Sequence, residues 1–172
     1  MTERHAQILV AGVGNTFMRD DGFGAEVVRL LKLREPEPGL TVEDFGTGGL
    51  DLAYEVMRGY DSLVLIDVMH GDGPPGTLYV LEPEESEIAA GIEDGETIDP
   101  HAMDPQTVLR FVRAVSGWPG NVTIVACEPL EISDYGMGLT PEVAAAVPRA
   151  VALVAETLVD LRERAARASA SA

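Results

Sequence analysis

Two periodicities alternate along the chain, one typical of buried strands and the other of amphipathic helices. Five short segments are rich in apolar and β-branched residues and are bounded by turn residues, which indicates strands. Between them, apolar residues recur every three or four positions, which indicates helices. The predicted strands are Gln7–Val13, Leu40–Phe45, Ser62–Val68, Thr77–Leu81 and Asn121–Cys127, and the predicted helices are Gly22–Leu33, Leu50–Tyr60, Pro105–Ser116 and Pro141–Arg164.

The alternation of strands with helices predicts an α/β fold with a mostly parallel sheet that is covered on both faces. No linker or internal repeat divides the chain, so we expect a single domain over residues 1–172, frayed at residues 1–6 and 166–172. The acidic segment Glu82–Thr97 has few large apolar residues and is expected to be a surface loop or a short helix.

Composition excludes several classes of function. The chain is 46% apolar, which argues against disorder, and its 29 acidic and 12 basic residues give a formal net charge of −17. Nucleic acids and anionic membranes need a positive surface, so neither is an expected partner. No signal peptide is recognisable before the first strand, and no apolar run reaches the roughly 18 to 20 residues that span a membrane. These features predict a cytoplasmic protein.

Acidic residues stand where two predicted strands end. A glycine turn at Gly12 and Gly14 is followed by Asp20 and Asp21, and Asp67 lies near the end of an otherwise apolar strand. Open α/β sheets build their sites at the carboxyl ends of parallel strands. Asp20 is interpreted as a cap of the following helix, with assistance to catalysis as the alternative. Asp67 either belongs to a site or pins a loop.

A histidine completes a candidate metal site. His101 lies just before a predicted helix, so Asp21, Asp67 and His101 come from three connections that converge on one sheet edge. Two carboxylates and an imidazole suit a divalent metal such as zinc or nickel and leave positions open for a substrate. His70 follows Asp67 by three residues and is a competing ligand candidate.

Other site types fit the sequence less well. A dinucleotide fingerprint would need a third glycine where Phe17 stands, and Asp20 and Asp21 would repel a pyrophosphate. The sequence supports neither a Ser-His-Asp arrangement nor an HExxH zinc helix. Cys127, the only cysteine, ends an apolar strand and is interpreted as a buried apolar residue rather than a nucleophile.

An ordered set of motifs resembles the hydrogenase maturation proteases, which trim the C-terminus of nickel-iron hydrogenase large subunits. The resemblance covers nearly the whole chain. It is carried by GVGNTFMRDDGFGAEVV near the start, DFGTGGL (44–50), LVLIDV (63–68), PGTLYVLEPEE (75–85), DPHAMD (99–104) and the segment from Glu128 to Pro141. It implies a three-layer α/β/α sandwich of the phosphorylase/hydrolase-like type. Residues 83–99 are longer and more acidic than expected of a minimal member.

The resemblance also implies a function. The partner would be a nickel-iron hydrogenase large-subunit precursor, whose inserted nickel is bound by Asp21, Asp67 and His101 as the signal for cleavage. Either nickel polarises the scissile carbonyl or positions a water, or Asp21 or Asp67 acts as general base and nickel serves recognition only. Gly46, Thr47, Gly48 and Gly49 either admit an extended substrate peptide or only form a tight turn. The alternatives are a nickel- or precursor-binding maturation chaperone that does not cut, and a nucleotide-binding domain.

Overall fold

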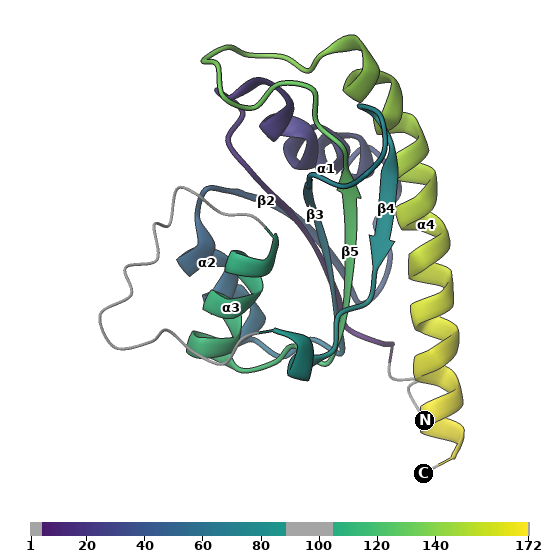
Figure 1. Cartoon of the computed structure of the whole chain (residues 1–172). Helices are drawn as coiled ribbons and strands as arrows, with labels where there is room; N and C mark the ends of the chain where they lie inside the picture. The colour runs from purple at the N-terminus through teal and green to yellow at the C-terminus, as the bar shows by residue number, and fades with distance from the viewer. Residues whose placement is uncertain (1–4, 89–104, 172) are drawn as a thin grey trace.

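A five-stranded sheet forms the middle of the molecule in the computed structural model, which describes residues 5–88 and 105–171 (Figure 1). The strand order is β2-β1-β3-β5-β4, and only β4 runs antiparallel to its neighbour. The strands are β1 (Ile8–Val13), β2 (Leu40–Gly46), β3 (Ser62–Val68), β4 (Leu78–Leu81) and β5 (Asn121–Cys127). The mostly parallel sheet predicted from the sequence is therefore confirmed.

Helices cover both faces of this sheet and make three layers. On one face, α1 (Phe23–Leu31) and α4 (Pro141–Ala170) pack on side chains such as Val64 and Ile66. On the other face, α2 (Gly49–Val56) and α3 (Pro105–Ser116) pack on side chains such as Leu63 and Leu65. Successive residues of β3 therefore point to opposite layers, as strand geometry requires. Because both faces are buried, β3 has no exposed residue.

The C-terminal helix is longer than the sequence pattern predicts. We expected fraying from residue 166, but α4 continues to Ala170. Its last turns are rich in alanine and carry two ion pairs with i,i+4 spacing, Asp160 with Arg164 and Glu163 with Arg167. High helix propensity and such pairs both favour continuation of the helix. Pro148 lies inside α4 without ending it.

The other boundaries agree with the predictions to within a few residues, and the acidic segment contains the short 3-10 helix η2 (Glu85–Glu87). His101 belongs to residues 89–104, which lie outside the described part of the chain. Within residues 5–88 and 105–171, no helix combines the length and the apolar character needed to cross a membrane. Cys127 is completely buried in the core, as predicted.

The connection from β1 to α1 is unusually close and sets the geometry of the site. A Cβ atom on Gly24 would lie 2.5 Å from the carbonyl oxygen of Ile66 and 2.7 Å from that of Val13. Only glycine permits this approach of a helix to two strands. The first turn of α1, and the 3-10 helix η1 (Arg19–Gly22) before it, are therefore held against the ends of β1 and β3.

Candidate active site

The site lies where the chain leaves neighbouring strands in opposite directions. From β1 the chain crosses through α1 to β2 on one side, whereas β3 lies on the other side of β1. Gly12 of β1 pairs with Ile66 of β3, so the residues after Gly12 lie beside Asp67. A crevice outside the carboxyl ends of such strands is the usual ligand-binding position in open α/β sheets.

Asp21 occupies one side of this crevice on a tightly folded turn. Its Oδ2 accepts a hydrogen bond from the backbone N–H of Asn15 at 2.7 Å. Gly14 has a φ of +124°, and a Cβ there would lie 2.1 Å from the backbone oxygen of Asp21. Gly14 therefore packs directly against the backbone of Asp21. Because Asp21 already takes the Asn15 N–H, the turn does not offer that donor to a pyrophosphate, which argues against the dinucleotide interpretation.

Asp20 has a structural role that differs from the predicted one. The residue is fully buried, and α1 has no side-chain cap. Its carboxylate accepts hydrogen bonds from the backbone N–H groups of Leu130, Glu131 and Thr140 at 2.7 to 2.9 Å, and from the Thr140 hydroxyl. Asp20 thus fastens the loop between β5 and α4 to η1. Capping was the wrong prediction, because sequence spacing does not show a partner 110 residues away.

Asp67 is buried at the end of β3, with only 1% of its surface exposed. Its Oδ1 accepts the N–H of Val68 at 2.7 Å. Asp67 alternates with Leu63 and Leu65, which pack toward α2 and α3, so its side chain belongs to the same face of the sheet. The next three residues, from Val68 to His70, line a cavity.

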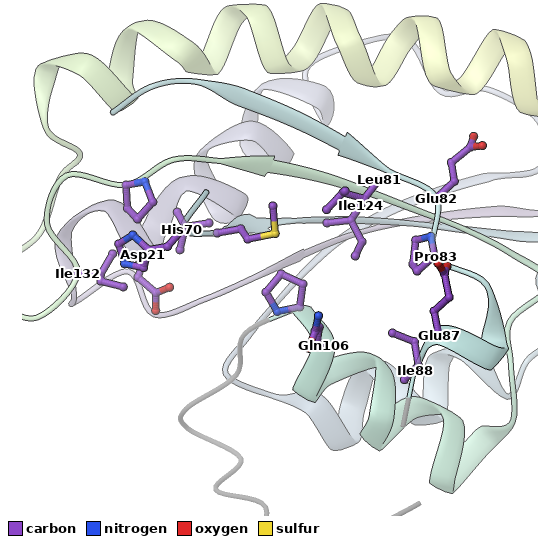
Figure 2. Close-up of a pocket in the computed structure, with 14 residues that line it drawn as sticks. Asp21, His70, Leu81, Glu82, Pro83, Glu87, Ile88, Gln106, Ile124 and Ile132 are labelled. Atoms are coloured by element: carbon purple, nitrogen blue, oxygen red, sulfur yellow. The ribbon is translucent and has the colours of Figure 1, made fainter. Parts of the chain in front are cut away.

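This cavity has a volume of about 750 Å³ and runs from Asp21 toward the far end of β4 (Figure 2). We call it the Asp21 cavity. Figure 2 shows Asp21, His70 and Ile132 at one end and Glu82, Glu87 and Ile88 at the other. The remaining lining residues are Val68, Met69, Leu81, Pro83, Pro105, Gln106, Ile124 and Pro129. The wall is thus largely apolar, with carboxylates at both ends.

A buried glutamate organises the polar groups beside the Asp21 cavity. Glu128 follows β5 and accepts hydrogen bonds from the Gly71 N–H at 2.5 Å and the Tyr79 hydroxyl at 2.8 Å. Its other oxygen lies 3.2 Å from Nδ1 of His70. Tyr79 reaches Glu128 because β4 pairs with β5, with Tyr79 opposite Ala126. Glu128 thereby holds the ring of His70 at the cavity wall.

The surroundings shift the pKa values of the Asp21 and Glu128 carboxyl groups in opposite directions. Desolvation raises the pKa of Asp21, and the Asn15 hydrogen bond only partly offsets it. Burial would also raise the pKa of Glu128, but the hydrogen bonds from Gly71, Tyr79 and His70 outweigh it, so its pKa is lowered. Asp21 is therefore the better proton acceptor of the two.

Cys127 does not belong to the reactive groups. Desolvation by burial, with a smaller contribution from the Asp20 charge, raises the pKa of its thiol to about 11. The thiol packs in the core on the α1 and α4 face of the sheet. A nucleophilic cysteine needs a lowered pKa and access to substrate, and Cys127 has neither.

The remaining predicted residues are placed as follows. Gly46–Gly49 end β2 and begin α2, and the N–H of Gly14 donates to the carbonyl of Gly46 at 2.9 Å, so this turn adjoins the Asp21 turn. These four residues are not among those that line the Asp21 cavity. His101 lies outside the described residues, so the three-residue metal set stays a prediction. Within the described ranges, no three His, Cys, Asp or Glu residues are grouped closely enough to hold a metal.

Sequence reasoning overlooked Glu128 and Tyr79. Glu128 directly follows a buried strand, the same signal that singled out Asp67, and this signal was enough to find it. Tyr79 gave no such signal, because its role depends on the antiparallel pairing of β4 with β5.

Comparisons with known proteins indicate the family of this chain. Residues 25–157 match the family model described as hydrogenase maturation protease. The chain is 32% identical over 146 residues to the hydrogenase expression/formation protein HupD of Rhizobium leguminosarum, covering 84% of this chain and 70% of that one. It is 31% identical over 160 residues to the coenzyme F420 hydrogenase subunit delta of Methanothermobacter thermautotrophicus, covering 89% and 95%.

Solved structures show the same relationship. The hydrogenase maturating endopeptidase HybD from E. coli superposes with a TM-score of 0.72 at 28% identity, over 90% of this chain and 93% of that one. The hydrogenase 2 maturation peptidase from Thaumarchaeota archaeon SCGC_AB-539-E09 gives 0.66 at 33% identity, over 88% and 97%. Because residues 25–157, which are most of the chain, match the family model, the chain belongs to the hydrogenase maturation protease family.

Proposed function

We propose that this protein is an endopeptidase that removes the C-terminal extension of a nickel-iron hydrogenase large-subunit precursor after nickel has been inserted. The observation that carries the proposal is the half-buried carboxylate of Asp21, placed on the wall of an elongated cavity beside the end of β3. Family membership makes peptide hydrolysis the chemistry to expect at this position. The cavity is elongated, as an extended peptide requires.

Nickel enters this proposal as part of the substrate. Asp21, Asp67 and His101 would complete its coordination only when the precursor carries it, so that cleavage depends on metal loading. The position of Asp67 supports the proposal, because Asp67 lies at the carboxyl end of β3, beside the residues that follow Gly12 and lead to Asp21. A histidine ligand would have to present a neutral nitrogen.

The proton acceptor in this scheme is Asp21. Its raised pKa and its open side toward the cavity suit a group that takes a proton from an attacking water. Substrate nickel would then polarise the scissile carbonyl or only hold it in place. Gly46–Gly49, beside the Asp21 turn, would border the path of the peptide.

Processing would take place in the cytoplasm. The single, buried cysteine is compatible with a reducing compartment.

The test compares nickel-loaded and nickel-free precursor by intact mass spectrometry. We expect loss of a C-terminal piece only from the loaded precursor, and no loss with the Asp21→Asn or Asp67→Asn variants. Glu142→Gln is a matched control, because Glu142 is exposed in the first turn of α4. Cleavage of nickel-free precursor would refute the proposal that inserted nickel is the signal for cleavage. A stable complex without cleavage would instead indicate a maturation chaperone.

A further inference from the structure

Four exposed residues beside η1 form a surface that the proposed chemistry does not use. Phe17, Tyr135 and Met137 expose 58%, 86% and 70% of their surface, and Arg19 is exposed among them. We call these four residues the Tyr135 patch. Aromatic residues, methionine and arginine are the types enriched where proteins bind other proteins.

Backbone pairing brings the two halves of the patch together from distant parts of the chain. Met18 and Gly136 form an isolated parallel bridge, in which the Gly136 N–H donates to the Phe17 carbonyl and the Arg19 N–H donates to the Gly136 carbonyl. The side chain of Arg19 lies across Gly136, where a Cβ would approach its Nε to 2.3 Å. Glycine is thus required for the arginine to lie there.

The patch is held firmly, although its side chains are exposed. Asp20 lies between the two halves and fastens the loop from β5 to α4 through backbone hydrogen bonds. Arg19 has a φ of +52°, an unfavourable conformation for a residue with a side chain. Exposed apolar groups on a fixed backbone lose little entropy when a partner binds.

Charge indicates what the partner should present. The protein has a net charge of −17, yet Arg19 stands in the middle of the patch. Its guanidinium lies 3.5 Å from the Met137 carbonyl oxygen. The carboxylate of Glu131 interacts with Arg19 through charge, but within the described residues Arg19 forms no ion pair within 4 Å. A partner carboxylate against Arg19, surrounded by apolar groups, would complement this surface.

The patch adjoins the catalytic carboxylate but faces a different hollow. Arg19 and Met137 line a second hollow of about 770 Å³ between α1 and the start of α4, whereas Asp21 lines the Asp21 cavity. The Cα atoms of Arg19 and Asp21 can be no more than about 7 Å apart. A partner bound on the patch therefore lies within reach of the cavity without filling it.

We propose that the Tyr135 patch docks the folded body of the large-subunit precursor while its C-terminal segment enters the Asp21 cavity. This inference rests on the proposed function and adds the surface that recognises the substrate as a protein. A C-terminal segment alone would occupy the Asp21 cavity and leave the patch uncovered. Two separate contact areas let the enzyme bind the precursor body independently of the residues that are cut.

The test is a kinetic comparison of two double variants with nickel-loaded precursor. Tyr135→Ser with Met137→Ser removes the patch. Tyr54→Ser with Met57→Ser removes the same residue types from α2, where they are 57% and 58% exposed. We expect the patch variant to raise KM at least tenfold and leave kcat within twofold, while the α2 variant changes neither by more than twofold. Unchanged urea midpoints would show that both variants fold.

A binding measurement separates the failure of this inference from that of the proposed function. If the wild type cleaves precursor and the patch variant keeps its KM within twofold, docking on the patch is refuted. If the wild type binds precursor without cleaving it, the endopeptidase proposal fails, and docking stands only if the patch variant loses affinity. If the wild type does neither, both proposals fail. If the patch variant only converts a dimer to a monomer in light scattering, the patch joins two copies and the inference is wrong.

Arg19→Glu tests the charge separately. We expect a KM raised about fivefold that falls as salt increases, opposite to the wild type, because repulsion replaces attraction. Arg167→Glu, at the far end of α4, is the control for a change in net charge. An equal effect of both variants would refute a specific carboxylate contact.

Discussion

Asp20 and Asp21 are neighbours in the sequence but belong to two different regions of the molecule. Asp20 lies in a closed region, where three backbone N–H groups and a hydroxyl surround its carboxylate. Asp21 lies in an open region, where its carboxylate accepts a hydrogen bond from the Asn15 N–H and has a cavity in front of it. The first carboxylate is fully used in holding a loop, and the second keeps free capacity for a substrate.

The difference shows that a pair of acidic residues is not by itself a two-carboxylate site. A 3-10 helix turns successive side chains about a third of a circle apart, so one points inward to the loop and the other outward to the cavity. Removing each carboxylate should therefore have separate consequences, one on stability and the other on chemistry.

The largest effect is expected from Asp20→Ala. The variant leaves the partly buried N–H groups of Leu130, Glu131 and Thr140 without their acceptor, which should lower the free energy of unfolding by about 3 kcal/mol. Urea unfolding measures this value. Asp134→Ala, in the same loop but exposed, is the control and should change stability by less than about 0.5 kcal/mol. Equal stability of the two variants would contradict the closed-region interpretation.

A smaller loss is expected from Glu128→Gln, which changes the group that holds His70 at the wall of the open region. Hydrogen bonds hold the folded pKa of Glu128 below its ordinary value of 4.5. The ionised form therefore contributes stability that is complete above pH 4.5 and is lost as the pH falls through the folded pKa. The stability difference from the wild type should be larger at about pH 7 than at about pH 3. A difference that is the same at both pH values would be evidence against these hydrogen bonds.

Asp21→Asn should change stability least while abolishing the proposed cleavage. Burial raises the folded pKa of Asp21 above its ordinary value of 3.8. The wild-type residue thus contributes stability that is complete below pH 3.8 and is lost as the pH rises through the folded pKa. Relative to the wild type, the variant should gain stability between about pH 3 and pH 7, as urea unfolding would show. A variant that is less stable at neutral pH would mean that Asp21 belongs to the closed region as well.

The reactivity of the Cys127 thiol measures how readily the closed region opens. The wild-type protein already carries this probe, so no cysteine has to be introduced. The thiol is buried and has a pKa of about 11, so we expect no reaction with a thiol reagent such as DTNB in the folded protein. In Asp20→Ala, the loosened loop should expose the thiol and allow labelling. Rapid labelling of the folded wild type would show that this region opens readily.

The sequence predicted the layers and the sheet because the central strands β1, β3 and β5 are buried on both faces and each helix on one, which leaves a clear periodicity. It also predicted where Asp21 and Asp67 lie, since both follow from the rule about strand ends. It missed what depends on distant pairing. The clamp of Asp20 on the loop after β5, and the contact of Tyr79 with Glu128, join residues that no local pattern connects.

Gly24 has a consequence for any redesign of this protein. The position carries no functional group and lies inside a helix, where alanine would ordinarily be stabilising. Here a single added methyl group would meet two carbonyl oxygens, and the helix would have to move away from the sheet together with the segment before it. An engineer who optimised helix propensity alone would therefore displace Asp21, so a position without any functional group constrains the geometry of the candidate site.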